Sequence, residues 1–151
     1  MNFHVYTDGS GTTGGPAGIA YVAFEQAAAD VFTLWREDAL PVENATNQQA
    51  EILAAAYALH QLPERSTVTI FSDSEYLVKG YNVWLPQWLE NGWKKLTGGE
   101  PANGAHWKRL VTAAERHESV TFQWLKGHDG HEHNERADQL AGEARAMAMS
   151  V

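Results

Sequence analysis

The chain has no cysteine among its 151 residues, which excludes disulfides and thiolate metal sites. A reducing compartment is compatible with this composition, and we expect the protein to be cytoplasmic. No apolar run approaches the roughly 20 residues that a membrane span needs. No positively charged segment followed by an apolar core precedes the first predicted strand, so we expect no secretory signal peptide.

Basic residues are also scarce, since 11 Lys and Arg stand against 19 Asp and Glu and the formal net charge is −8. This balance argues against a general phosphate-binding surface, because non-specific nucleic-acid binding relies on Lys and Arg. It leaves room for a local basic groove, and it suits a site where clustered carboxylates hold divalent cations. The length predicts a single domain, residues 1–151, with a buried core.

An acidic residue follows the first predicted strand. Phe3–Tyr6 is rich in the aromatic and β-branched residues that favour strands. Asp8 comes next, in a cluster with Gly9, Ser10 and Gly11 that we expect to end the strand. An ionised Asp is costly to bury unless it is paired or binds a cation, so Asp8 is a metal or catalytic candidate. An Asx-turn is the alternative interpretation.

The glycines at positions 9, 11 and 14 satisfy the dinucleotide-binding pattern G-x-G-x-x-G. That pattern requires a helix directly afterwards. The apolar alternation of Ala17–Glu25 instead favours a strand, with a second antiparallel strand over Val31–Asp38. We therefore expect three antiparallel strands at the start of the chain, and a nicotinamide-binding domain remains the less favoured alternative.

A capped helix follows these strands. Thr46 and Gln49 match a capping box. Apolar residues at positions 52, 55, 56 and 59 then predict a helix that runs to about Leu62. Glu51 lies in its early turns, beside the apolar stripe. A solvated Glu is the simpler interpretation, but this position also allows Glu51 to point toward the end of the first strand.

A second acidic residue, Asp73, follows a predicted strand over Thr67–Phe71. A strand–helix–strand order favours parallel pairing of this strand with the first one. Asp8 and Asp73 would then lie side by side at one edge of the sheet, where open α/β sheets bind their ligands.

The segment between residues 74 and 104 is rich in tryptophan and interrupted by proline and glycine. Trp84 and Trp88 lie one helical turn apart, so a small satellite core is the simpler interpretation. An aromatic projection could also contact nucleic acid if basic residues accompanied it. Over Asn82–Gly104, Lys94 and Lys95 are balanced by Glu90 and Glu100, so this stretch has no net charge.

The remaining predicted elements are a helix over about residues 104–117, a strand over Val120–Leu125 and a final helix capped by Asn134. Asp138 falls in the second turn of that helix, where the positive helix end favours a carboxylate. The polar loop over residues 126–134 contains three histidines, but their spacing matches no established zinc site. His128 is a better candidate for proton transfer beside a carboxylate cluster.

Several of these stretches jointly resemble the type I ribonuclease H family across nearly the whole chain. The matching stretches are Thr7–Ser10, Thr46–Glu51, Thr69–Ser74, Trp124–His128 and Asn134–Asp138. Their joint occurrence is far more specific than any one of them. The resemblance implies an α/β fold of the RNase H-like type, with a five-stranded mixed sheet whose first three strands are antiparallel and which is flanked by helices.

The resemblance also implies an activity. The family hydrolyses the RNA strand of RNA–DNA hybrids with two Mg²⁺ ions, for which Mn²⁺ can substitute, and leaves 5′-phosphate and 3′-hydroxyl ends. The implied metal ligands and the catalytic loop histidine are Asp8, Glu51, Asp73, Asp138 and His128. We expect an RNA–DNA hybrid as the partner and a monomeric protein. A non-catalytic hybrid-binding module on the same fold is the alternative.

The substrate contacts that the resemblance implies are Gly9, Ser10, Thr46, Asn47, Gln48, Glu75, Trp84, Lys94 and Lys126. Among them, Asn47 and Gln48 would contact 2′-hydroxyls of the RNA strand, and Thr46 would lie near a DNA phosphate. Glu75 stands where the family usually has Gln, and Gln49 stands where Arg is common. The Trp-rich segment resembles the family's substrate-binding handle but lacks most of its lysines, which bears on hybrid affinity.

Overall fold

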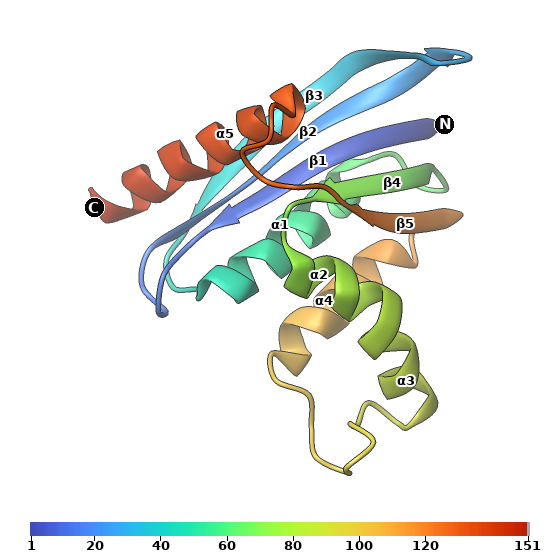
Figure 1. Cartoon of the computed structure of the whole chain (residues 1–151), viewed down its shortest axis with the longest axis vertical. Coiled ribbons are helices and arrows are strands. Elements are labelled where there is room, and N and C mark those ends of the chain that lie inside the picture. Colours follow the sequence, from blue (N-terminus) through green and yellow to red (C-terminus); the bar gives the residue numbers. More distant parts are fainter. Residues whose placement is uncertain (151) are drawn as a thin grey trace.

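The computed structural model describes residues 1–150, which form a five-stranded sheet with helices on both faces (Figure 1). The strands are β1 Asn2–Ser10, β2 Ala17–Ala28, β3 Val31–Val42, β4 Thr67–Ser72 and β5 Ser119–Trp124. Their spatial order is β3-β2-β1-β4-β5, with antiparallel pairing from β3 to β1 and parallel pairing from β1 to β5. The expected mixed sheet with three antiparallel strands is confirmed.

The helical elements are α1 Asn47–Gln61, α2 Glu75–Lys79, the π-helical turn η1 Gly80–Trp84, α3 Leu85–Glu90, α4 Gly104–Ala114 and α5 Glu132–Met149. Helix α1 starts with the expected capping box, in which the backbone N–H of Gln49 donates to the Thr46 side chain. In Figure 1, α5 crosses one face of the sheet over β1–β3, whereas α2, η1 and α3 lead into the projection at the bottom.

The two faces of β1 have different roles. Phe3 and Val5 are buried in the main core with Ile52 and Leu59 of α1. Because side chains alternate along a strand, Asp8 faces the opposite side of the sheet, which α5 covers. Asp8 is therefore directed toward the helix that carries the fourth acidic candidate.

Small residues let α5 pack closely on the sheet. A Cβ at Gly18 of β2 would lie 2.1 Å from the backbone oxygen of Ala141, so only glycine fits there. Ala137, Ala141 and Ala144 of α5 are buried against this surface. This close packing sets the height of α5 above the sheet.

The prediction that β1 stops before Asp8 was wrong. Asp8, Gly9 and Ser10 continue the strand and pair with residues 20, 19 and 18 of β2. The partner strand supplies hydrogen bonds that outweigh the weak strand preference of this cluster. Strand β3 likewise extends through Pro41, which is tolerated because β3 is an edge strand and one side of it needs no donor.

Three other expectations also differ from the structure. Helix α5 begins at Glu132 with His131 as its N-cap, so Asn134 lies inside the first turn and is not the cap. Helix α4 ends at Ala114, short of the predicted end at residue 117. The dinucleotide-binding alternative was wrong, because the segment after the glycines is strand β2 and not a helix.

Within residues 1–150, every helix is too short or too polar to cross a membrane.

Candidate active site

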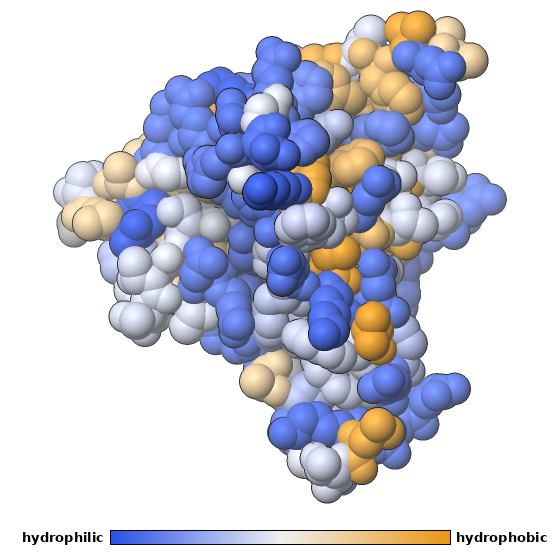
Figure 2. Space-filling model, viewed as in Figure 1, coloured by the Kyte–Doolittle hydropathy of each residue, from blue (hydrophilic) through white to orange (hydrophobic). Residues whose placement is uncertain are grey.

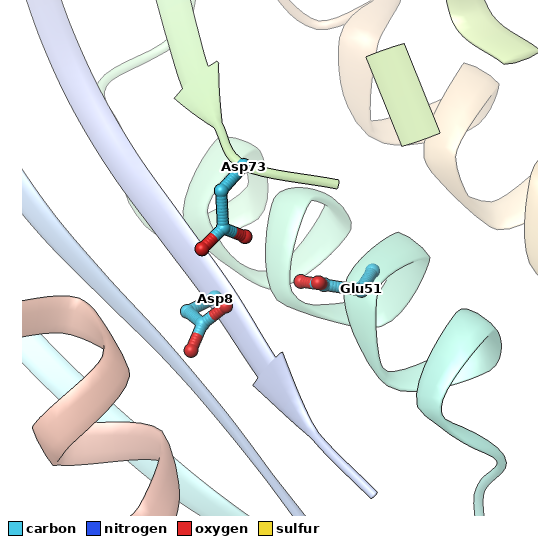
Figure 3. Close-up of side chains that lie close together, drawn as sticks. All are labelled: Asp8, Glu51 and Asp73. Atoms are coloured by element: carbon cyan, nitrogen blue, oxygen red, sulfur yellow. The ribbon is translucent and has the colours of Figure 1, made fainter. Parts of the chain in front are cut away.

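Three carboxylates meet near the carboxyl ends of the neighbouring parallel strands β1 and β4. Asp8 comes from β1, Glu51 from α1, and Asp73 directly follows β4, with their side chains pointing toward one another (Figure 3). One oxygen from each lies within 4.8 Å of the other two. Asp8 and Glu51 are only 4% and 5% exposed, and Asp73 is half-buried. The expected meeting of Asp8 with Asp73 is therefore confirmed, and Glu51 joins them.

The sheet register explains why the two aspartates are neighbours. Tyr6 of β1 pairs with Phe71 of β4 in the parallel ladder. Asp8 and Asp73 each lie two residues further along, so both reach the same edge of the sheet.

Glu51 reaches this edge because α1 packs directly on the backbone of β1. A Cβ at Gly9 would lie 2.4 Å from the carbonyl carbon of Ala50 and 2.5 Å from the backbone nitrogen of Glu51. The backbone N–H of Gly9 donates to Glu51 Oε1 at 2.7 Å. Gly9 is buried, so its contribution is to bring α1 close and to orient the Glu51 carboxylate.

Asp138 approaches the cluster from α5. Its side chain is exposed, in contrast to Asp8 and Glu51. It is close enough to Asp8 to contribute to the raised pKa of the Asp8 carboxyl. The four acidic residues thus come from four different elements and converge on one place.

Burial and mutual repulsion disfavour the charged forms of these acids. Burial is the main cause that raises the pKa of Asp8 to about 10, followed by Glu51, Asp138 and Asp73. Burial also raises the pKa of Glu51, followed by the charge of Asp73, whereas the hydrogen bond from Gly9 lowers it. A bound divalent cation would lower the pKa of both carboxyls, because it favours the ionised carboxylates. Oxygen donors of this kind suit hard cations such as Mg²⁺ and Mn²⁺.

Two further residues, neither of them predicted as a site residue, form hydrogen bonds with Asp73. Asn134 Nδ2 donates to Asp73 Oδ2 at 3.4 Å, and Asn134 is 2% exposed. Trp124 Nε1 donates to the backbone oxygen of Asp73 at 3.1 Å. A sequence signal existed for Asn134, because it precedes Asp138 by four residues and thus shares its helix face.

The loop between β5 and α5 passes over Asp73. A Cβ at Gly127 would lie 2.6 Å from Asp73 Oδ2, so this glycine allows the close passage. His128 follows immediately, with an exposed side chain and a backbone φ of 56°. Lys126 is exposed on the same loop. The loop therefore brings the backbone between Lys126 and His128 against Asp73 and leaves both side chains exposed.

The start of α1 is the next region near the carboxylate cluster. The backbone N–H of Gly11 donates to Asn47 Oδ1 at 3.3 Å, which links the loop after β1 to the helix. Asn47 and Gln48 are exposed, whereas Thr46 and Ser10 are half-buried. These residues lie at the start of the helix that carries Glu51 or on the strand end next to it.

Tryptophans of the Trp-rich segment pack, as predicted, but they do so on the main core and not in a separate satellite core. Trp88 is 9% exposed in the main core. Trp84 is half-buried, with its ring centroid 5.6 Å from Tyr76 and 6.3 Å from Trp88. Glu75, at the start of α2, and Lys94 are exposed. Figure 2 shows the projection at the bottom as a mostly polar surface with separate apolar residues.

The family model described as RNase H matches residues 1–146. Ribonuclease H of Lachnoclostridium phytofermentans is 40% identical over 144 residues, which cover 93% of this chain and 90% of the relative. Ribonuclease H of Dinoroseobacter shibae is 42% identical over 145 residues, which cover 93% of this chain and 89% of the relative.

Solved structures agree with the fold. LC9-RNase H1, a type 1 RNase H with the type 2 active-site motif, matches with a TM-score of 0.82 at 27% identity, covering 97% of this chain and 73% of that one. LC11-RNase H1, solved in complex with an RNA/DNA hybrid, matches with a TM-score of 0.68 at 24% identity, covering 97% and 99%. Since the family model and close relatives both span most of its length, the chain belongs to the RNase H family.

Proposed function

We propose that this chain hydrolyses the RNA strand of RNA–DNA hybrids with Mg²⁺ held by Asp8, Glu51, Asp73 and Asp138, and leaves 5′-phosphate and 3′-hydroxyl ends. The observation that carries this proposal is the convergence of three carboxylates within 4.8 Å of one another in a chain of the RNase H family. Mn²⁺ would substitute, because it accepts the same oxygen ligands.

The acidic residues have distinct tasks in this reaction. These carboxylates would hold two divalent cations, which would supply an activated water and charge stabilisation at the scissile phosphate. Asp8 and Glu51 contribute buried oxygens whose negative charge is costly without a cation. Asp73 is held in place by Asn134, whereas Asp138 is exposed and completes the set from α5. His128, on the loop that passes over Asp73, would move a proton or assist product release.

Recognition of the RNA strand is assigned to the exposed start of α1. Asn47 and Gln48 carry amide groups that can bond to a 2′-hydroxyl, the group that distinguishes RNA from DNA. The other proposed contacts are Ser10, Thr46, Glu75, Trp84, Lys94 and Lys126. Gly9 acts indirectly, because its N–H is bonded to Glu51. We further propose that the protein acts as a cytoplasmic monomer and that residues 1–151 are one domain.

An assay on end-labelled duplexes tests this function. Purified protein should cut the RNA strand of a hybrid in Mg²⁺ or Mn²⁺ and should be inactive in excess chelator. Double-stranded RNA, double-stranded DNA and single-stranded RNA of the same sequence serve as controls and should remain uncut. Binding of the hybrid without cleavage would instead support the non-catalytic binding module. Equal cleavage of both strands would contradict the assignment of strand recognition.

A further inference from the structure

Both polar groups of the Gln49 side chain form hydrogen bonds within the protein. Its Oε1 accepts a hydrogen bond from the backbone N–H of Thr46 at 3.0 Å, which completes the capping box of α1. Its Nε2 donates to Asn103 Oδ1 at 3.1 Å, a link between residues 54 positions apart. One neutral side chain therefore fixes the start of α1 and connects it to the residue that precedes α4.

Asn103 links Gln49 to Tyr76. Its backbone lies in the left-handed region with φ 60° and ψ 27°, where Asn is among the residues best tolerated. Its Nδ2 donates to the Tyr76 hydroxyl at 3.0 Å, and Trp107 Nε1 donates to the same hydroxyl at 3.2 Å. Trp107 is fully buried, so the line of hydrogen bonds ends on the rigid core.

Gln49 and Tyr76 are each next to a different group of proposed substrate contacts. Gln49 follows Asn47 and Gln48, the proposed contacts to the RNA strand. Tyr76 belongs to α2 and packs edge-on against Trp84 of the Trp-rich segment, with 5.6 Å between ring centroids. The network thus links Gln49, beside the strand-recognition residues, to Asn103 and Tyr76, which belong to the Trp-rich segment.

We propose that Gln49, Asn103 and Tyr76 are positioning residues that hold the start of α1 and the Trp-rich segment in fixed relation, so that both contact one hybrid. This inference rests on the proposed function. Pre-organising two contact regions reduces the cost of ordering them on binding. Contacts remote from the reacting phosphate affect ground and transition states alike, so the effect is on KM rather than on kcat.

The experiment is a double-mutant cycle between Gln49→Met and Tyr76→Phe. Each single variant loses two hydrogen bonds. It should raise the KM for hybrid at least about threefold, which corresponds to one net hydrogen bond, with kcat nearly unchanged. Gln49 and Tyr76 act through Asn103, so the double variant should be little worse than the weaker-binding single variant. The salt dependence of binding should not change, because neither substitution removes a charge.

The control is Tyr57→Phe, the same chemical change on α1 outside the network. The Tyr57 hydroxyl donates to Asp38 Oδ2 at 2.5 Å, so this variant loses one side-chain hydrogen bond. It should leave KM unchanged and be additive with Gln49→Met. A second readout does not depend on activity: exchange of the Asn103 side-chain amide protons, measured by NMR, should accelerate in both network variants and not in the control.

The outcomes separate the two proposals. Additive effects of Gln49→Met and Tyr76→Phe, or an unchanged KM in a protein that cleaves hybrid, would overturn the positioning role and leave the proposed function intact. Failure of the unaltered protein to cleave hybrid would overturn the proposed function. Unchanged Asn103 amide exchange in both variants would show that the network is not coupled, whatever the activity.

Discussion

Among single residues, Asp8 combines deep burial with the repulsion of three other carboxylates. Its ordinary pKa of 3.8 applies to the unfolded chain, whereas the folded value is raised to about 10. The folded state therefore keeps a proton that the unfolded state has released. Because the unfolded state binds fewer protons in this window, the stability of the metal-free protein falls as the pH rises between these two values.

We predict that Asp8→Asn abolishes hydrolysis and raises the melting temperature of the metal-free protein at pH 8. The substitution removes the cost of protonating Asp8 on folding and keeps the side-chain volume. A gain of about 1 kcal/mol would shift the midpoint by roughly 2–4 °C. Thermal unfolding between pH 5 and pH 9, in chelator and in Mg²⁺, measures both effects.

The variant should also lose stability less steeply as the pH rises, and Mg²⁺ should stabilise it less than the unaltered protein. Hybrid cleavage by Asp8→Asn at the unaltered rate would remove Asp8 from the metal ligands. A melting temperature that falls with pH as steeply in the variant would show that Asp8 is not the source of this dependence.

The loop histidine gives a second prediction. His128→Asn should lower turnover by roughly one to three orders of magnitude, within the range of acid–base groups. Asn tolerates the left-handed backbone at this position but cannot exchange a proton near neutral pH. The melting temperature should barely change, because the side chain is exposed.

Steady-state kinetics on the hybrid measures this effect, and His131→Asn is the matched control. His131 is exposed on the same loop and makes no capping hydrogen bond with its side chain. It should retain normal turnover. Equal losses in both variants would indicate that the loop conformation, and not proton transfer by His128, limits the rate.

Between elements, the contact of β1 with α1 leaves no room for a side chain at Gly9. Gly9→Ala places a methyl group 2.4 Å from the backbone of α1, so the helix must move away from the strand. Overpacking of this kind costs about 1–3 kcal/mol. The same shift withdraws Glu51, so we predict loss of hybrid cleavage together with a weaker stabilisation by Mg²⁺.

Urea unfolding with and without Mg²⁺ tests this prediction, with Gly15→Ala as the control. Nothing lies within 4 Å of a Cβ at Gly15, so its stability should change by less than about 1 kcal/mol. If Gly9→Ala unfolds at the same urea concentration as Gly15→Ala and keeps full Mg²⁺ stabilisation, the close packing on α1 does not position Glu51.

The strands and helices were easier to predict from the sequence than the contacts between them. Apolar alternation and the strand–helix–strand order were sufficient for the mixed sheet and for the meeting of Asp8 with Asp73. The extension of β1 through Gly9 depends on β2, and no local pattern records which strand will be its partner. Pro41 is acceptable in β3 only because that strand lies at an edge, which follows from the whole sheet order.

Residues that support the site were harder to predict than the acidic residues themselves. Glu51 could be proposed from its place beside an apolar stripe, but its orientation depends on the N–H of Gly9, 42 positions away. Asn134 resembled a helix cap, yet it contacts Asp73 across 61 positions. Such contacts depend on tertiary distance, which periodicity and capping patterns do not encode.

Over the whole molecule, the net charge of −8 leaves few cations for the hybrid backbone. The Trp-rich segment offers exposed positions where cations could be added. Leu89 and Glu90 are exposed at the end of α3, where the helix C-terminus favours positive charge. Asn91 is unsuitable, because its Nδ2 donates to the backbone oxygens of Lys94 and Lys95 and so holds the following turn.

We predict that Leu89→Lys with Glu90→Lys lowers the KM for hybrid and leaves kcat nearly unchanged, because contacts remote from the metals bind ground and transition states alike. Each new phosphate contact should steepen the fall of log affinity with log salt by up to about 0.9. Salt titrations of binding and turnover measure both quantities. The control, Glu118→Lys with Ser119→Lys, changes the net charge equally at the start of β5, the end of the sheet opposite Asp73. Equal changes of KM and salt slope in both double variants would indicate that the overall charge is responsible. If Leu89→Lys with Glu90→Lys changes neither quantity, the Trp-rich segment does not touch the hybrid.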